Sequence, residues 1–294
     1  KAKAQAIARE QEGEIDLLSK IIDEGRLAQH ESQTQQARDM IAEFVQQAMQ
    51  GQMVLSRNLE ASVQARIAEI DRLLSAQLNE IMHSEPYQKL EGSWRGLHHL
   101  VYESETSVML KIRVLNVSKK DLLKDLERAA EFDQSAVFKK VYEEEYGTFG
   151  GQPFGALIGD FYFSNHPQDM LLLEKMAQVA AAANAPFIAA SAPQLFGWES
   201  FQEMTEVRDL AKIFDRTEYA KWRSFRDSED SRYVGLTMPR TLMRLPYGKE
   251  TVPTETFNFE EDVDGKDHNK YLWGNAAYSF GTRLTEAFAM YGWC

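Results

Sequence analysis

The chain has 294 residues, of which 44% are hydrophobic, and this length suits about two domains with a sizeable core. Its formal charge of −12 argues against nucleic-acid binding and against an anionic membrane surface, because both need clustered cations. The most apolar window, residues 176–190, is too short to cross a bilayer. The sequence has one cysteine, Cys294, which excludes intrachain disulfides and cysteine zinc sites, as expected for a protein of a reducing cytoplasm.

Near the start, residues 15–27 predict a short amphipathic helix that ends at Gly25. Such a helix either packs on its own domain or docks into a groove of another protein, and the residues leave both readings open. Its apolar face consists of Leu17, Leu18, Ile21 and Ile22.

Two further helices are predicted before residue 83, one over residues 40–49 and a longer one over residues 59–82. The longer helix has apolar residues at spacings of three and four, which suits packing against another helix. We therefore predict an N-terminal helical region, residues 1–82, whose apolar surface is either closed on itself or shared with a partner or the next domain. We call the apolar residues of the longer helix the seam: Leu59, Val63, Ile67, Ile70, Leu74, Leu78 and Ile81.

Residues 83–294 read as one α/β domain, so the predicted fold is mixed α/β with a helical N-terminal arm. Ser84 and Pro86 predict a helix start, residues 107–117 alternate as a strand does, and Ser118 resembles the cap of a further helix. A strand over 156–163, a helix over 170–183 and a strand over 187–190 predict a βαβ unit with parallel strands. Residues 233–238 predict another strand, and residues 273–288 a final helix.

No sequence motif predicts a phosphate-binding, metal-binding or catalytic site. The glycine cluster 147–155 lacks the lysine and the preceding strand of a phosphate loop, so a turn is favoured. The acidic run 260–267 lacks EF-hand spacing and favours a solvated loop. His98 and His99 are adjacent, whereas a zinc pair on a helix needs a spacing of four.

One weak enzyme hypothesis rests on His166, which follows the strand over 156–163 and has Asp160 and Asp169 nearby in sequence. No nucleophile elbow accompanies it, and the run 219–226 of aromatic and basic residues favours packing over base stacking. We predict no catalytic residue, no metal site and no cofactor.

Four stretches together resemble one family, the large sheath subunit of the bacterial type VI secretion system (TssC/VipB). They occur in the family's order and span most of the chain. The matching stretches are Pro86–Leu97, Phe154–Phe161, Ala192–Gly197 and Leu272–Tyr278.

The resemblance implies a structural, cytoplasmic bacterial protein that polymerises with its smaller partner TssB (VipA) and with neighbouring copies around the Hcp inner tube. It also implies that the AAA+ ATPase ClpV binds an N-terminal helix, which here matches Leu17, Leu18, Ile21 and Ile22. By position, the seam from Leu59 to Ile81 is the candidate for TssB packing.

Members of this family continue beyond the position that matches Cys294, so we expect a fragment truncated before the C-terminal part and unable to polymerise by itself. Two other classes stay open from the residues alone. One is a cytosolic α/β enzyme with its site near His166, and the other is a generic scaffold protein that uses the helix over residues 15–27.

Overall fold

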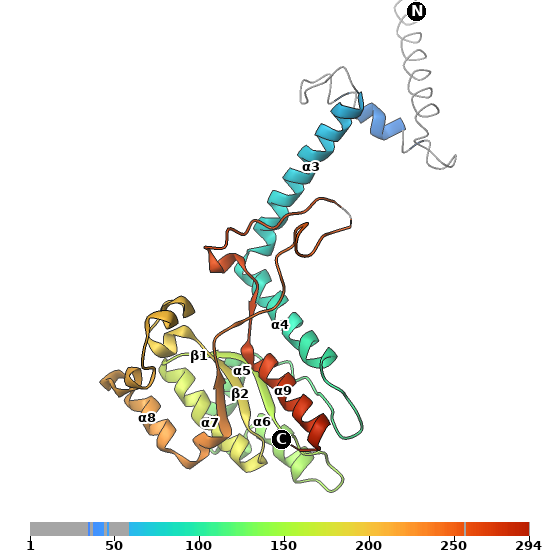
Figure 1. Cartoon of the computed structure of the whole chain (residues 1–294). Helices are drawn as coiled ribbons and strands as arrows, with labels where there is room; N and C mark the ends of the chain where they lie inside the picture. The colour runs from blue at the N-terminus through green and yellow to red at the C-terminus, as the bar shows by residue number, and fades with distance from the viewer. Residues whose placement is uncertain (1–34, 36–37, 44–45, 47–58, 256, 294) are drawn as a thin grey trace, which may run out of the picture. The chain divides into compact units, whose positions relative to one another are not determined.

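The computed structural model describes residue 35, residues 38–43, residue 46, and residues 59–255 and 257–293 (Figure 1). The chain divides into two compact units, Lys1–Ala76 and Gln77–Cys294. Helix α3 (Leu59–Met82) spans the division, so the domain boundary expected at residue 82 stays a prediction. In the first unit the described residues 38–43 are helical, in agreement with the helix predicted there.

The second unit contains a three-stranded parallel sheet in the order β1 (Leu157–Phe163), β2 (Phe187–Ser191) and β3 (Val234–Thr237). Helix α7 (Pro167–Ala183) connects β1 to β2, so the predicted βαβ unit is confirmed. The mixed helix-and-strand fold class is confirmed with it. Every residue of the central strand β2 is buried, as expected for a parallel strand covered on both faces.

Residues of β1 face two different helices. Leu157, Phe161 and Phe163 pack into the main core with the apolar face of α7. Ile158 points the other way, toward Gly281 of α9 (Ala276–Tyr291). The period-two pattern of a buried strand therefore places α7 and α9 on opposite faces of the sheet.

Helix α4 (Glu85–Tyr102) packs on α9 and on β5 (Trp273–Gly274), which pairs with β4 (Thr241–Leu242) in a two-stranded antiparallel sheet. Its buried residues are Gly92, Gly96 and Leu100. Ser84 precedes the helix as predicted, but its hydroxyl donates to the carbonyl of Ile81 instead of capping α4.

The remaining helices surround this core. Ser118 caps α5 through a hydrogen bond from the amide of Asp121, 3.1 Å, so that cap is confirmed. These remaining helices are α5 (Lys119–Arg128), α6 (Ala136–Phe138), the π-helix η2 (Lys139–Tyr146) and α8 (Ala220–Asp227). The short 3-10 helices are η1 Phe132–Gln134, η3 Pro193–Phe196, η4 Phe201–Glu206, η5 Ala211–Asp215, η6 Thr217–Tyr219, η7 Glu229–Tyr233 and η8 His268–Lys270.

The strand predicted over residues 107–117 is wrong in this structure. The segment contains no regular secondary structure and has no ladder partner among the described residues. Alternation of apolar residues signals a strand only where a neighbouring strand can take up its main-chain hydrogen bonds. In the described part of the chain, no helix is long and apolar enough to cross a membrane.

Candidate functional site

The seam of α3 is largely uncovered. Ile67 is 46% exposed and Leu74 is 50% exposed, although both belong to an apolar stripe at helical spacing. Val63, Ile70 and Ile81 are exposed too, while Leu78 is half-buried and the side chain of Leu59 lies outside the described residues. A row of exposed aliphatic side chains on one helix face is the usual signature of a surface that another protein covers.

Helix α4 carries a second uncovered row, which the sequence analysis did not single out as a binding surface. Its small residues Gly92 and Gly96 face β5 and α9, respectively, so several large apolar residues on the other side of the helix are left exposed. Trp94 is 66% exposed and Leu90 is 57% exposed. The signal was present in the sequence, because two glycines four residues apart mark the face where another element approaches closely. We name Tyr87, Leu90, Trp94 and Val101 the α4 stripe.

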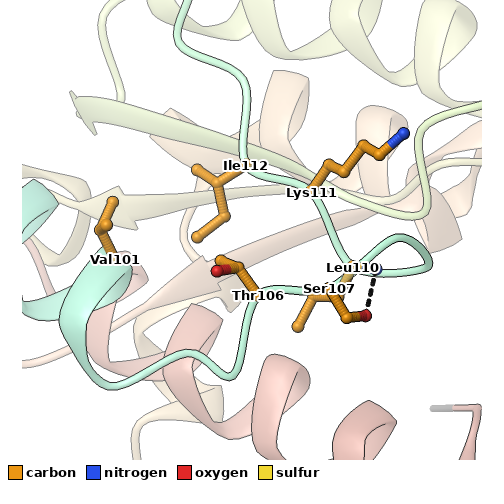
Figure 2. A pocket seen from close by; sticks show the side chains of 6 residues that line it. All are labelled: Val101, Thr106, Ser107, Leu110, Lys111 and Ile112. Carbon is orange, nitrogen blue, oxygen red and sulfur yellow. Dashed lines mark hydrogen bonds between the residues drawn. The ribbon is translucent and has the colours of Figure 1, made fainter.

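A pocket of about 430 Å³ opens at the C-terminal end of the α4 stripe (Figure 2). Val101 lies on one side of it, and the segment after α4 supplies the other side. The apolar part of the lining comes from Val101, Leu110 and Ile112, and the polar part from Thr106, Ser107 and Lys111.

Three of the stretches that carry the family resemblance meet where α4, β1 and α9 come together. Ser93 of α4 donates a 2.5 Å hydrogen bond to Asp160 of β1. Burial, followed by the negative charge of Asp160, raises the pKa of Tyr162 to about 12 and raises the pKa of Tyr278 further. The Tyr278 hydroxyl also hydrogen-bonds to Asp160, so Asp160 joins α4 to α9 through Ser93 and Tyr278. The junction holds helices and sheet together.

Asn275 is 2% exposed and links α9 to an irregularity in β1. Its side-chain oxygen accepts from the amide of Ala277, 2.8 Å, and so caps α9. Its amide nitrogen donates to the carbonyls of Gly159 and Phe161, at 3.3 and 3.2 Å. The register between β1 and β2 shifts in this part of β1, so Asn275 satisfies carbonyls that lie where the ladder is irregular.

A buried ion-pair cluster joins α4 to the long connection after β4. The Arg244 guanidinium contacts Glu261 at 2.5 and 3.1 Å and Glu91 at 2.9 Å. Burial raises the pKa of Glu261, but hydrogen bonds from Arg244 and from the amide of Tyr247 outweigh it and hold that pKa below its ordinary value. The solvated loop expected over residues 260–267 is therefore wrong at Glu261, which is buried, and holds for its exposed neighbours.

The residues of the enzyme hypothesis are held by separate structural partners. His166 caps α7 by accepting from the amide of Gln168, 3.3 Å. Asp160 binds Ser93, while Asp169 binds Lys119 at 2.6 Å. None of the three lines the pocket beside Val101. Within the described ranges, no group of three acidic, histidine or cysteine residues is placed to hold a metal ion.

The glycine cluster forms a turn before β1, as predicted, with Gly150 in the left-handed region at φ 81°. The helix over residues 15–27, with Leu17, Leu18, Ile21 and Ile22, lies outside the described residues. Its role as a binding element stays a prediction.

Comparison with known proteins gives two findings. The family described as "EvpB/VC_A0108, tail sheath N-terminal domain" (VipB) matches residues 64–294. The chain is also 49% identical over 274 residues to the type VI secretion system sheath protein TssC1 of Pseudomonas aeruginosa. That alignment covers 91% of this chain and 55% of the relative, so the chain spans about half the length of the relative.

Proposed function

From its membership of the VipB family of type VI tail sheath proteins, we propose that this chain is the N-terminal part of a sheath subunit that polymerises with TssB around the Hcp tube. The observation that carries the proposal is the exposed seam of α3. Burying aliphatic side chains there stabilises a complex by roughly 25 cal/mol for each Å² removed from water. A helix of TssB with a complementary apolar face is the partner that we assign to the seam.

The α4 stripe supports assembly at more than one surface. A sheath subunit contacts a small partner and neighbouring copies of itself, and it therefore needs several separate apolar patches. The seam lies on α3, while the α4 stripe ends at the pocket lined by Val101. We assign the seam to TssB and the α4 stripe to contacts within the sheath lattice.

The proposed role is structural, in the bacterial cytoplasm, with no catalytic step in this chain. The polar side chains of the enzyme hypothesis already hold structural elements together, so they are poorly placed for exchange with a substrate. In this proposal ClpV hydrolyses ATP and recycles the contracted sheath by binding Leu17, Leu18, Ile21 and Ile22. The amphipathic pattern of residues 15–27 supports that assignment.

Affinity capture tests the partner assignment. Tagged TssB should retain the chain through size-exclusion chromatography in a stoichiometric complex. A chain that elutes by itself, while remaining folded by circular dichroism, would contradict the proposal. A peptide covering residues 10–30 should bind the N-terminal domain of ClpV, and replacement of Leu18 and Ile22 by Asp should abolish that binding.

A further inference from the structure

The segment between α4 and α5 has the side-chain pattern of a strand but no ladder partner among the residues that the structure describes. Its apolar residues are unusually open to water: Val108 is 84% exposed and Met109 is 79% exposed, and Val114 and Leu115 are exposed as well. Apolar side chains as exposed as these are unfavourable on a surface that stays open to water.

The main chain is hydrogen-bonded only at the start of this segment, as far as the described residues show. Near its start, Ser107 accepts from the amides of Met109 and Leu110 through its hydroxyl and donates its own amide to the carbonyl of Leu110. From Lys111 to Val117, no main-chain N–H or C=O group takes part in a hydrogen bond with any described residue. Extended main chain in this state can add a strand along its edge.

Contacts at its ends hold the segment beside β1. Lys111 Nζ donates to the side chain of Gln152 at 2.9 Å, and the Arg113 guanidinium lies over the ring of Phe154 at 5.6 Å, both before β1 begins. At the far end, Lys119 Nζ donates to the carbonyl of Tyr162 at 2.6 Å. The segment therefore follows the direction of β1 without forming a ladder with it.

The pocket of about 430 Å³ lies against the same segment (Figure 2). Leu110 and Ile112 come from the segment, and Val101 faces them from the end of α4. A strand that paired with the segment would have alternate side chains directed to one face, where this pocket offers an apolar site.

We propose that residues 111–117 are a strand completed by an extended, alternately apolar segment from the sequence that follows the N-terminal domain in sheath proteins of this family. The matched family is described as a sheath N-terminal domain, and the alignment covers only 55% of the TssC1 relative, so such proteins contain further sequence that can supply the strand. The inference rests on family membership and does not depend on the assignment of TssB to the seam.

Pairing with a second copy of the same segment is disfavoured by charge. A parallel in-register self-pair places Lys111 and Arg113 opposite the same cations of the other copy, and an antiparallel self-pair centred on Ile112 places Lys111 opposite Arg113. Like charges directly across a strand pair are destabilising. A strand with a different sequence avoids this repulsion.

Hydrogen–deuterium exchange tests the proposal on two proteins, this chain and a monomeric sheath protein in which the same domain is followed by its C-terminal sequence. We expect the amides of residues 111–117 to exchange at least about 100-fold more slowly in the longer protein. Equal, fast exchange in both proteins overturns the proposal. Protection that appears only after TssB is added, or only as the concentration of the longer protein rises, also overturns it, because the strand then comes from another chain.

Proline substitution supplies a matched variant. V114P removes one main-chain N–H, whereas the control V114T keeps it. V114P should abolish the protection and lower Tm in the longer protein, V114T should do neither, and both should leave the Tm of this chain unchanged. A drop in Tm of this chain with V114P alone would show that the segment is already paired in it. Since the measurement is made on monomers, its failure is distinct from a failure to form tubes.

Discussion

Gly96 of α4 lies so close to the ring of Tyr278 in α9 that a Cβ added at Gly96 would come within 2.3 Å of Tyr278 Cδ2. Both residues belong to stretches that carry the family resemblance, Pro86–Leu97 and Leu272–Tyr278. The closeness of the two helices explains why α4 turns its glycines inward and leaves Trp94 and Leu90 exposed. Packing at one face of α4 thus determines which residues remain available at the other.

Replacing Gly96 by Ala should destabilise the fold. Ala favours a helix by about 1 kcal/mol over Gly, but overpacking against a buried ring costs about 1–3 kcal/mol. We expect a net loss of up to about 2 kcal/mol in the free energy of unfolding, measured by urea denaturation. The matched control is Gly155→Ala, because a Cβ there meets nothing within 4 Å. A gain of about 1 kcal/mol in the Gly96 variant, the helix preference of Ala by itself, would contradict the close packing of α4 on α9.

Both the side-chain oxygen and the side-chain nitrogen of Asn275 should contribute to the stability of the fold. Asn275→Ala removes the cap of α9 and leaves two carbonyls of β1 without a donor, at a cost of about 1–3 kcal/mol. Asn275→Asp keeps an oxygen for the cap and loses the donors, so it should also destabilise. Thermal unfolding measures both. Asn165→Ala removes one exposed hydrogen bond, from the side-chain amide to the carbonyl of Glu218, and should change stability little.

Removing only one partner of the buried pair of Arg244 and Glu261 should lower the free energy of unfolding strongly. Arg244→Met leaves the carboxylates of Glu261 and Glu91 without their common cation, and loss of one partner in a buried pair costs about 3–5 kcal/mol. Lys89→Met removes an exposed pair with Glu85 and should change stability little, because solvent screens such pairs. Chemical denaturation of the two variants compares the loss of stability at the buried pair with the loss at the exposed pair. Similar losses for both would mean that the cluster is solvated.

The lowered pKa of Glu261 predicts how the free energy of unfolding changes with pH. The pKa of Glu261 is held below its ordinary value of 4.5, so its contribution to stability is complete above that value. The contribution is lost as the pH falls through the lower pKa of the folded state. Urea denaturation between pH 7 and pH 3 should therefore show a steeper loss for wild type than for Glu261→Gln. Parallel pH profiles for the two proteins would show that Glu261 is not ion-paired.

Charges placed on the seam should block TssB without unfolding the chain. Ile67→Asp and Leu74→Asp alter side chains that are about half exposed, so circular dichroism should be unchanged. Each should weaken capture by TssB at least about tenfold, as expected for an anchor residue at an interface. Ala65→Asp adds the same charge to the opposite face of α3 and should bind as wild type does. If all three variants bind alike, the seam is not the TssB surface.

The sequence predicted the elements that are stabilised within this chain. The apolar runs around Ile158 and Ile188, with a helix between them, predicted the parallel βαβ unit because both strands are buried in their own core. The prediction failed for elements whose stabilising partner is distant in the chain or is not among the described residues. The buried pair of Glu261 with Arg244 joins residues 17 apart in the chain through no local pattern. The alternation around Val114 has no partner strand in the described part of the chain.

Candidate surfaces were predicted only in part. The spacing of the seam was visible because it follows the period of a helix, and its exposure agrees with a role in binding. The α4 stripe has the same periodicity, but from periodicity alone a stripe that faces the core cannot be told from one that faces a partner. Only the contact of Gly96 with Tyr278 shows which face of α4 is covered.

Electron microscopy of a co-expressed pair tests the central claim most directly. A sheath protein carrying this N-terminal domain, expressed with TssB and examined by negative stain, should form hollow helical tubes. The same protein with Ile67→Asp and Leu74→Asp should form none, while Ala65→Asp should preserve them. Tubes that form equally well with the charged seam, or no tubes from the wild-type pair, would contradict the account.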